Sequence, residues 1–360
     1  MRKCFAGTAA ALLAAVLFLP VKAVSARSAY VLDAVSGRVL YERGGCDRSL
    51  IASTTKIMTA LVVCEQCNVL DRMRIPKEAV GIEGSSLYLK EGEVLTVQEL
   101  LYGMMLHSGN DAATALAIYC GGTVEGFAQM MNDKAHVLGL SGTHFENPHG
   151  LDSPNHYSTA RDLAVLAGYA MENPVFQKTV SAKKIYAADR YLTNHNKLLW
   201  RVEGADGVKT GYTRAAGRIL VSSAQRNGRR IVAVTIDDPN DWEDHAKFLE
   251  DGFSTYRVQE LIRQGQDVGM MEVVGGESRR VSLLAAEDFS YPLAQGEQIL
   301  LQIPGPGFSY SPAVEGADAG FVYVLVNGKA VGKVPVVYGQ TVEQEPEKER
   351  SFLQKLRERI

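Results

Sequence analysis

Strand patterns stand at both ends of a long helical block, and this order narrows the folds that are open to the chain. The first strands form a hairpin pattern around the Ser36-Gly37 turn, and two later strands are joined across Asn227-Gly228. The expected strands are residues 30–33, 38–41, 207–210, 218–224 and 230–236. Helical patterns occupy residues 53–64, 97–119, 124–137, 159–172 and 242–253. Because strands from both ends of a domain can pair in one antiparallel sheet with helices packed beside it, we predict an α+β domain over residues 27–257.

A second domain is expected downstream. After about residue 258, short strand-like runs alternate with Gly and Pro and end in a hairpin pattern around Asn327-Gly328. We predict a small all-β domain over residues 258–340. The chain of 360 residues is 46% hydrophobic and 22% charged, which excludes a disordered or fibrous protein. Its formal net charge of −3 gives no reason to expect a nucleic-acid partner.

The N-terminus has the pattern of a signal peptide. Arg2 and Lys3 precede an apolar run over residues 9–19, and residues 24–26 supply a small-x-small cleavage pattern. A membrane anchor is the alternative, but the run is shorter than the roughly 18–20 residues that a span needs. We therefore predict a signal peptide over residues 1–26 and an exported mature chain.

The last twenty residues form a polar linker and a short tail, residues 341–360. Phe352, Leu353, Leu356 and Ile360 share one face of a predicted helix, with basic residues on the other face. Such a tail fits an anionic membrane surface and fits a solvated end equally well.

The cysteines and histidines point to no metal site. Cys4 would leave with the signal peptide, and Cys64 and Cys67 form a C-x-x-C pattern that is typical of a redox pair or half of a zinc site. No second C-x-x-C or H-x-x-x-H completes a metal shell, and no H-E-x-x-H occurs. Small half-buried residues or one structural disulfide are the simpler interpretation. We predict no metal.

One candidate nucleophile opens the first helix. Ser53 and Lys56 fit S-x-x-K, and positions i and i+3 of a helix share a face, so the lysine amine can reach the serine hydroxyl and take its proton. The helix dipole also favours developing negative charge at this end. The motif by itself is weak, because residues 181–184 match it too.

Two further motifs follow at a distance. Residues 108–110 fit S-x-N, which residues 153–155 also match, and a turn or helix cap is the structural alternative. Residues 209–211 read K-T-G on a predicted strand, where they would offer a positive charge, a hydroxyl and a glycine that admits a substrate backbone. The order S-x-x-K, S-x-N, K-T-G is the set found in class A β-lactamases and penicillin-binding proteins.

With these motifs in place, the chain resembles serine-type D-alanyl-D-alanine carboxypeptidases, the S11-like low-molecular-mass penicillin-binding proteins. The resemblance extends through residues 108–113, 147–151, 193–196 and 209–213, and the β-rich end resembles the C-terminal domain of that family. It implies a penicillin-binding/β-lactamase-like domain with an antiparallel sheet flanked by helices. The implied activity removes the terminal D-alanine from peptidoglycan pentapeptide stems outside the cytoplasm, without a cofactor, and is inhibited by covalently bound β-lactams.

The resemblance also implies roles for the catalytic residues. Ser53 would attack the carbonyl of the penultimate D-alanine and form an acyl-enzyme, and Lys56 would be the general base. Lys56 must then be neutral, which burial and the charge of Lys209 can achieve. Ser108 would pass a proton to the leaving amine, and Asn110 would hold the Lys56 side chain and the substrate amide.

The K-T-G segment is implied to bind the substrate. Lys209 and the Thr210 hydroxyl would receive the terminal carboxylate, and Gly211 would let the substrate backbone approach. The N–H groups of Ser53 and Tyr212 would form the oxyanion hole.

Four nearby polar residues are expected to be structural. We predict that Asp111 caps the helix that follows the S-x-N motif, and that His149, Asp162 and His195 fix loops.

Two other functions compete with the carboxypeptidase. A class A β-lactamase needs a glutamate in an E-x-x-L-N context to activate the deacylating water. The glutamates between the second and third motifs, at 125, 146, 172 and 203, lack that context. A penicillin-binding sensor that is acylated without turnover is the second alternative, and such sensors usually require a membrane span, which the mature sequence does not offer.

Overall fold

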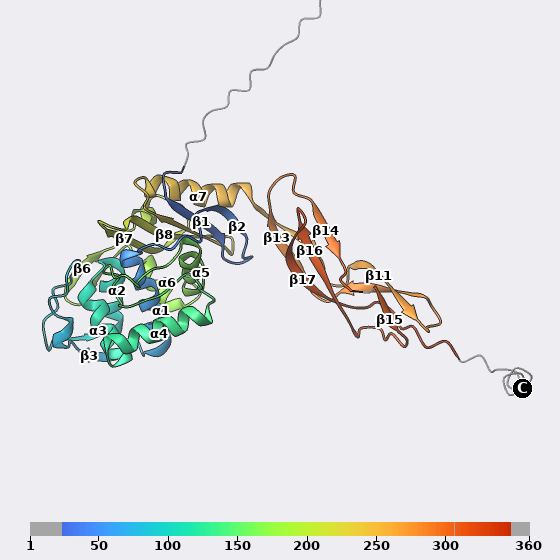
Figure 1. Cartoon of the computed structure of the whole chain (residues 1–360), viewed down its shortest axis with the longest axis horizontal. Coiled ribbons are helices and arrows are strands. Elements are labelled where there is room, and N and C mark those ends of the chain that lie inside the picture. Colours follow the sequence, from blue (N-terminus) through green and yellow to red (C-terminus); the bar gives the residue numbers. More distant parts are fainter. Residues whose placement is uncertain (1–23, 306, 347–360) are drawn as a thin grey trace, which may run out of the picture.

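The computed structural model describes residues 24–305 and 307–346. These residues form two domains that lie side by side along the long axis of the molecule, an α+β domain and an all-β domain joined at Tyr256 (Figure 1). The predicted fold class is confirmed.

The sheet of the first domain pairs the two ends of that domain. Its order is β2-β1-β9-β8-β7, and all neighbouring strands are antiparallel. The first strand contacts the last through pairs such as Ala29 with Thr235. The strands are β1 (Ser28–Asp33), β2 (Val39–Arg43), β7 (Ala205–Thr213), β8 (Gly217–Arg226) and β9 (Arg229–Ile236). Every residue of β1 and β9 is buried, because helices cover both faces of the sheet.

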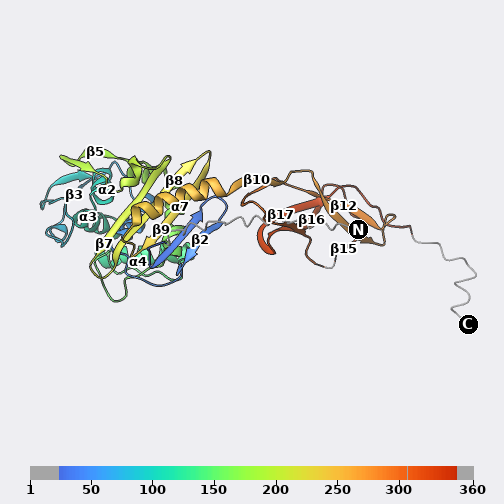
Figure 2. The same ribbon diagram turned by 90° about the horizontal axis from the view of Figure 1, so that it is seen from above.

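Those helices form two layers. Helix α7 lies on one face of the sheet, and the helical block lies on the other, with α5 against β1 and β9 (Figures 1 and 2). The helices are α1 (Lys56–Gln66), α2 (Val97–Leu106), α3 (Asn110–Gly121), α4 (Val124–Val137), α5 (Ala160–Ala170), α6 (Pro174–Ser181) and α7 (Asp241–Thr255). Three short 3-10 turns accompany them, η1 (Ala52–Thr55), η2 (Lys77–Ala79) and η3 (Lys197–Trp200).

The prediction of one helix over residues 97–119 is wrong. The chain leaves the helix after Leu106, because Ser108 adopts a left-handed backbone conformation with φ of 67°. A new helix then starts at Asn110. Two small antiparallel sheets that the sequence did not predict flank this block. They pair β3 (Arg72–Arg74) with β4 (Val94–Thr96), and β5 (Lys184–Ala187) with β6 (Arg190–Thr193).

The second domain consists of strands alone. A six-stranded sheet has the order β14-β16-β17-β12-β11-β15, and β10 pairs with β13. The predicted hairpin is present, since Asn327 and Gly328 both have positive φ and join β16 to β17. The strands are β10 (Arg257–Ile262), β11 (Asp267–Val274), β12 (Arg280–Ala285), β13 (Phe289–Leu293), β14 (Ile299–Gln302), β15 (Phe308–Tyr310), β16 (Asp318–Val326) and β17 (Lys329–Tyr338).

Arg38, in the turn between β1 and β2, connects the two domains. Its guanidinium donates to the Pro292 carbonyl at 2.7 Å and to the Glu297 carboxylate at 2.6 Å. It also lies over the rings of Tyr256 and Tyr291, 4.6 and 5.3 Å from their centroids. Planar, half-buried contacts of this kind fix the angle between two bodies, so this one side chain ties the hairpin to the β-rich domain.

Two terminal predictions fall mainly outside the described residues. The predicted signal peptide covers residues 1–23, which are outside, and 24–26, which are inside. The amphipathic tail lies wholly within residues 347–360, which are also outside. Within the described part of the chain, no helix is long and apolar enough to cross a membrane.

Replacing Arg38 by Ala should loosen the junction between the domains. It removes hydrogen bonds from a charged group that are worth about 1.5–3 kcal/mol each. We expect a larger radius of gyration and a poorer fit to a single conformer in small-angle X-ray scattering. Arg43→Ala, on the same hairpin but bonded to the Val24 carbonyl instead, should leave the scattering unchanged. Identical curves for Arg38→Ala and the wild type would contradict the prediction.

Candidate active site

Ser53 lies on η1, immediately before the first helix. Between Ile51 and Lys56 every other residue is buried, and Ser53 alone is partly exposed. Ala52 before it has a φ of 45°, a left-handed conformation that costs a non-glycine residue of order 1–3 kcal/mol and is found where function requires it. The turn thus presents the serine hydroxyl to solvent while its neighbours anchor the segment in the core.

The amine of Lys56 is buried beneath this serine. Its Nζ lies 3.0 Å from Ser53 Oγ, and it donates to Asn110 Oδ1 at 2.6 Å and to the His149 carbonyl at 2.7 Å. Burial, followed by the charge of Lys209, holds the pKa of Lys56 well below its usual value. A neutral amine has two N–H donors and one lone pair. With both donors used by carbonyl oxygens, the lone pair is left for the Ser53 hydroxyl.

Ser108 and Asn110 lie at the break between α2 and α3, and Asn110 accepts from the Lys56 amine. The left-handed turn at Ser108 brings its hydroxyl within 3.1 Å of Lys209 Nζ, which donates to it. The Asn110 amide is oriented at both ends, because its Nδ2 donates to the Glu83 carbonyl at 2.6 Å. The break that the sequence did not predict is therefore what places Asn110 on Lys56 and Ser108 on Lys209.

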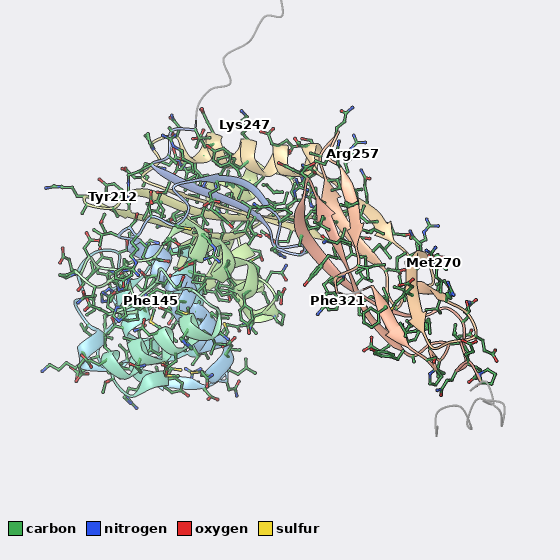
Figure 3. All side chains as sticks on the ribbon, turned by 45° about the vertical axis from the view of Figure 1, so that its right-hand side comes forward. Phe145, Tyr212, Lys247, Arg257, Met270 and Phe321 are labelled. Carbon is green, nitrogen blue, oxygen red and sulfur yellow. The ribbon has the colours of Figure 1, made fainter. Side chains whose placement is uncertain are left out.

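Strand β7 supplies the opposite wall. Lys209 is buried, and burial lowers its pKa to about 7. Thr210 is half-buried and Tyr212 is exposed at the outer edge of the domain, away from the β-rich domain (Figure 3). A Cβ on Gly211 would lie 3.2 Å from the Ile51 carbonyl and 3.3 Å from Ser53 N. Glycine at this position thus lets the strand lie against the nucleophile turn; the predicted approach of a substrate backbone at Gly211, which also lines the groove, stays a prediction.

These residues open into one groove of about 370 Å³. Ser53, Ser108, Thr210, Gly211 and Tyr212 line it, with Lys56, Asn110 and Lys209 buried below. All eight predicted site residues are therefore in one place. The sequence did not single out the other lining residues, which are Ser85, Lys197, Arg218, Ile219, Asp241 and Trp242. Arg218 could have been found from strand register, because it pairs with Tyr212 across β7 and β8.

The four residues expected to be structural lie around the site. Asp111 is in the first turn of α3, where it accepts bonds from its neighbour Ala112 and from the loop at residues 86–89. His149 reaches Lys56 through its backbone carbonyl, while burial lowers the pKa of its ring to about 3. Asp162 accepts from the loop at residues 142–143. His195 lines the groove, and its backbone N–H donates to the Leu106 carbonyl at 3.3 Å.

The competing motif matches do not form sites. Ser181 ends α6 and Lys184 begins β5, so the two do not share a helical turn. Ser153 and Asn155 both bind the Glu146 carboxylate at the surface. In the part of the chain that the structure describes, no group of His, Cys, Asp and Glu side chains is placed to hold a metal ion.

Comparison with known proteins identifies both domains. Residues 16–240 match the family model of D-alanyl-D-alanine carboxypeptidases, peptidase S11, and residues 256–344 match the C-terminal domain of penicillin-binding protein 5. The chain is 32% identical over 327 residues to D-alanyl-D-alanine carboxypeptidase DacF of Bacillus subtilis, covering 86% of this chain and 84% of that protein. It is 31% identical over 341 residues to DacC of Escherichia coli, covering 89% and 85%.

Solved structures of related proteins have the same fold. Penicillin-binding protein 5 of Haemophilus influenzae superposes with a TM-score of 0.75 at 27% identity, covering 89% of this chain and 98% of that one. The Streptomyces K15 DD-transpeptidase matches with a TM-score of 0.61 at 34% identity, covering 64% of this chain and 98% of that one.

The pH profile should report the link between the two lysines. Because the charge of Lys209 lowers the pKa of Lys56, Lys209→Met should raise it. Lys56 must be neutral to act as a base, so acylation is lost as pH falls through its pKa, and this acid limb should move to higher pH. The rate itself should fall roughly 10- to 100-fold. The measurement is the pH dependence of acylation by benzylpenicillin. Lys197→Met, in the same groove, is the control, and an unmoved limb in Lys209→Met would refute the link.

Gly150 supports the nucleophile turn from below. It has a φ of +90°, and a Cβ there would lie 1.8 Å from the Ala52 carbonyl oxygen. Gly150→Ala should therefore displace η1, lower the unfolding free energy by about 3 kcal/mol and abolish acylation of Ser53. Gly228 has a similar φ of +78° with open space around it, so Gly228→Ala should cost about 1 kcal/mol and acylate normally. Equal effects of the two substitutions on melting and acylation would contradict this account.

Proposed function

The chain belongs to the D-alanyl-D-alanine carboxypeptidase family, and on this premise we propose that it hydrolyses the terminal D-Ala-D-Ala bond of peptidoglycan stem peptides with Ser53 as nucleophile. The observation that carries the proposal is the buried Lys56 amine, held by Asn110 and the His149 carbonyl and facing Ser53 Oγ at 3.0 Å. A general base placed at hydrogen-bond distance from a hydroxyl is the arrangement that activates a serine.

Acylation then proceeds in the groove. The Ser53 proton passes to Lys56 as Oγ attacks the carbonyl carbon of the penultimate D-alanine. The N–H groups of Ser53 and Tyr212 stabilise the oxyanion, a contribution of roughly 3 kcal/mol for each donor. Ser108 passes a proton to the leaving amine, the C–N bond breaks and free D-alanine departs.

The terminal carboxylate binds on the β7 side of the groove. Lys209 provides a positive charge below the groove, and the Thr210 hydroxyl provides a donor within it. A carboxylate entering the site also favours the charged form of Lys209. Substrate binding therefore supplies the counter-ion that the buried amine lacks.

Hydrolysis of the acyl-enzyme completes the cycle, and the same serine explains covalent inhibition by β-lactams. Asp241 is the residue lining the groove that carries a carboxylate, and its two oxygens accept from Arg218 at 2.7 and 2.8 Å. Both oxygens of this carboxylate are engaged by one guanidinium, an arrangement that holds Arg218 in place and does not direct the carboxylate at a deacylating water. This supports the carboxypeptidase over the β-lactamase.

The proposal includes export. A substrate in the cell wall requires the enzyme outside the cytoplasm, and the N-terminal sequence has the pattern of a signal peptide.

Contact of the basic tail with an anionic membrane surface is a further part of the proposal. Flotation with anionic vesicles of the mature chain, compared with a chain ending at Pro346, tests it: loss of binding on truncation supports the contact, and equal or absent binding refutes it.

Intact mass after incubation with benzylpenicillin tests the nucleophile. We expect a stable adduct on the wild type and none on Ser53→Ala. Lys56→Arg should acylate about 10²–10⁴ times more slowly, because a guanidinium stays charged and cannot accept the proton. Release of D-alanine from a peptide ending in D-Ala-D-Ala measures turnover. Hydrolysed penicillin without a lasting adduct would favour a β-lactamase, and acylation without D-alanine release would favour a sensor.

A further inference from the structure

The two helices that carry the catalytic residues meet again at their far ends. Helix α1 starts at Lys56 and α3 starts at Asn110, and these two side chains are joined at 2.6 Å. Cys67 is the C-cap of α1, and Cys120 is in the last turn of α3. The thiols of Cys67 and Cys120 are close enough for each to shift the pKa of the other. The helix pair is therefore in contact through side chains at both of its ends.

The contact between the sulfurs is held in place from both sides. Cys67 N–H donates to the Val63 carbonyl at 3.0 Å, which fixes the end of α1. Next to Cys120, the Tyr119 hydroxyl donates to Asp71 at 3.1 Å and so ties α3 to the segment after α1. Both cysteines are partly exposed and pack against the core, so a reagent in solution can reach them while the backbone keeps them adjacent.

We propose that Cys67 and Cys120 are oxidised to a disulfide once the chain is exported. The inference rests on the export that the proposed function includes, because disulfides persist in oxidising compartments. The Cys67 thiolate attacks the disulfide of a protein thiol oxidase and forms a mixed disulfide, releasing one oxidase thiolate. The Cys120 thiol then gives up its proton as its sulfur attacks the Cys67 sulfur, and the second oxidase thiolate is released. Two electrons and two protons pass from the protein to the oxidase.

The other two cysteines do not fit this role. Cys64 lies on α1 itself, one turn before Cys67, so a bond between these two would not join α1 to α3. Cys67 has a lowered pKa because the Cys120 thiol donates to it. Cys46 is exposed in the loop after β2, away from both helices. The C-x-x-C pattern is thus a coincidence of spacing, and the partner of Cys67 is on another helix.

The bond would close a loop that contains two of the eight site residues, Ser108 and Asn110. The segment from Cys67 to Cys120 includes β3, β4, α2 and the S-x-N turn with Ser108. Closing a loop of this length restricts the unfolded chain. We expect reduction to lower the melting temperature by roughly 5–15 °C.

The test uses the mature protein purified from the exported fraction. Before reduction its mass should be lower than the all-thiol mass by two hydrogen atoms, and peptide mapping should find Cys67 linked to Cys120. Reductant should lower the melting temperature of the wild type and of the control Cys64→Ser. Cys67→Ser and Cys120→Ser should already melt at the lower temperature and not respond to reductant. Four free thiols, or a Cys64–Cys67 bond, would overturn the inference.

The same samples separate this inference from the proposed function. Benzylpenicillin should acylate Ser53 in both oxidised and reduced protein. An adduct on a protein with free thiols would refute the disulfide and leave the function intact, whereas a disulfide without an adduct would refute the nucleophile and leave the disulfide intact.

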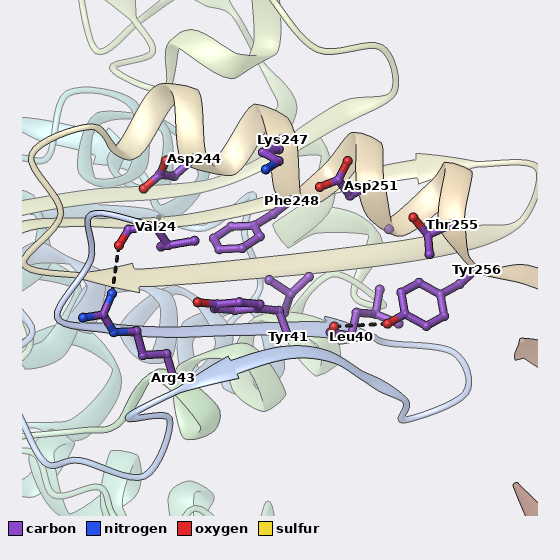
Figure 4. Close-up of a pocket in the computed structure, with 12 residues that line it drawn as sticks. Val24, Leu40, Tyr41, Arg43, Asp244, Lys247, Phe248, Asp251, Thr255 and Tyr256 are labelled. Atoms are coloured by element: carbon purple, nitrogen blue, oxygen red, sulfur yellow. Dashed lines mark hydrogen bonds between the residues drawn. The ribbon is translucent and has the colours of Figure 1, made fainter. Parts of the chain in front are cut away.

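A separate observation concerns the N-terminus. Ala26 is fully buried, and Ser25 donates through its N–H to Asp244 at 2.8 Å and through its hydroxyl to the buried Asp238. The Val24 carbonyl accepts from Arg43 at 2.8 Å, and its side chain lies beside Phe248 (Figure 4). Removing residues 24–26 would take a hydroxyl donor from a buried carboxylate whose second oxygen already has no partner, which is costly.

We infer that signal peptidase cleaves after Ala23 and not after Ala26. Residues 21–23 read Val-Lys-Ala and have the same Val-x-Ala form as residues 24–26. Cleavage there keeps all three packed residues and makes Val24 the first residue of the mature enzyme. This inference also rests on export.

N-terminal sequencing of the exported protein should begin at Val24, and a start at Arg27 would overturn the inference. Val21→Glu, which places a charge three residues before the cut, should block processing. Val24→Glu is the matched control, because the same charge would block only a cut after Ala26. A chain produced from Arg27 onward should melt several degrees below one produced from Val24. Equal melting temperatures would refute the argument that residues 24–26 stabilise the fold. Acylation of both chains by benzylpenicillin tests the proposed function separately.

Discussion

The burial of one amine organises the catalytic domain. Lys56 is fully buried, and a charged ammonium in such a place would be expensive to desolvate. Its neutral form is therefore favoured, and a neutral amine needs only two acceptors and one donor. Asn110 and the His149 carbonyl are the acceptors, and the Ser53 hydroxyl is the donor. Three segments far apart in sequence are thus fixed by the hydrogen-bonding capacity of a single nitrogen.

Lys209, the second buried lysine of the site, has a different role from Lys56. Its pKa is lowered to about 7 by burial, so it is poised between charged and neutral forms near neutral pH. The protonation state of Lys209 affects Lys56, because the pKa of Lys56 falls further when Lys209 is charged. An anionic substrate group near Lys209 therefore both binds and sets the electrostatics around the base. The two lysines act as one coupled pair, in which one recognises the substrate and the other moves the proton.

Much of the fold and of the candidate site could be predicted from the sequence, and there are physical reasons why the other features could not. The reach from Lys56 to Ser53 follows from helical spacing, and the shared sheet follows from strand patterns at both ends of the domain. The left-handed turns at Ala52 and Ser108 could not be predicted, because neither residue is a glycine and only tertiary packing holds them. The split between α2 and α3 was missed for the same reason. Arg218 enters the groove through its pairing with Tyr212 across β7 and β8, so it could be found only once the register of these two strands had been worked out.

The Arg38 junction has a mechanical consequence. The β-rich domain bears on the turn between β1 and β2, at one edge of the sheet, while the catalytic strand β7 forms the opposite edge (Figure 1). A force applied through the β-rich domain reaches the first domain by two routes, through Arg38 at the far edge of the sheet and through the chain itself at Tyr256, the residue after α7. Because the first turn of α7 supplies Asp241 and Trp242 to the groove, tension on the chain is carried along this helix toward the site, whereas the Arg38 contacts divert part of it to the opposite edge of the sheet.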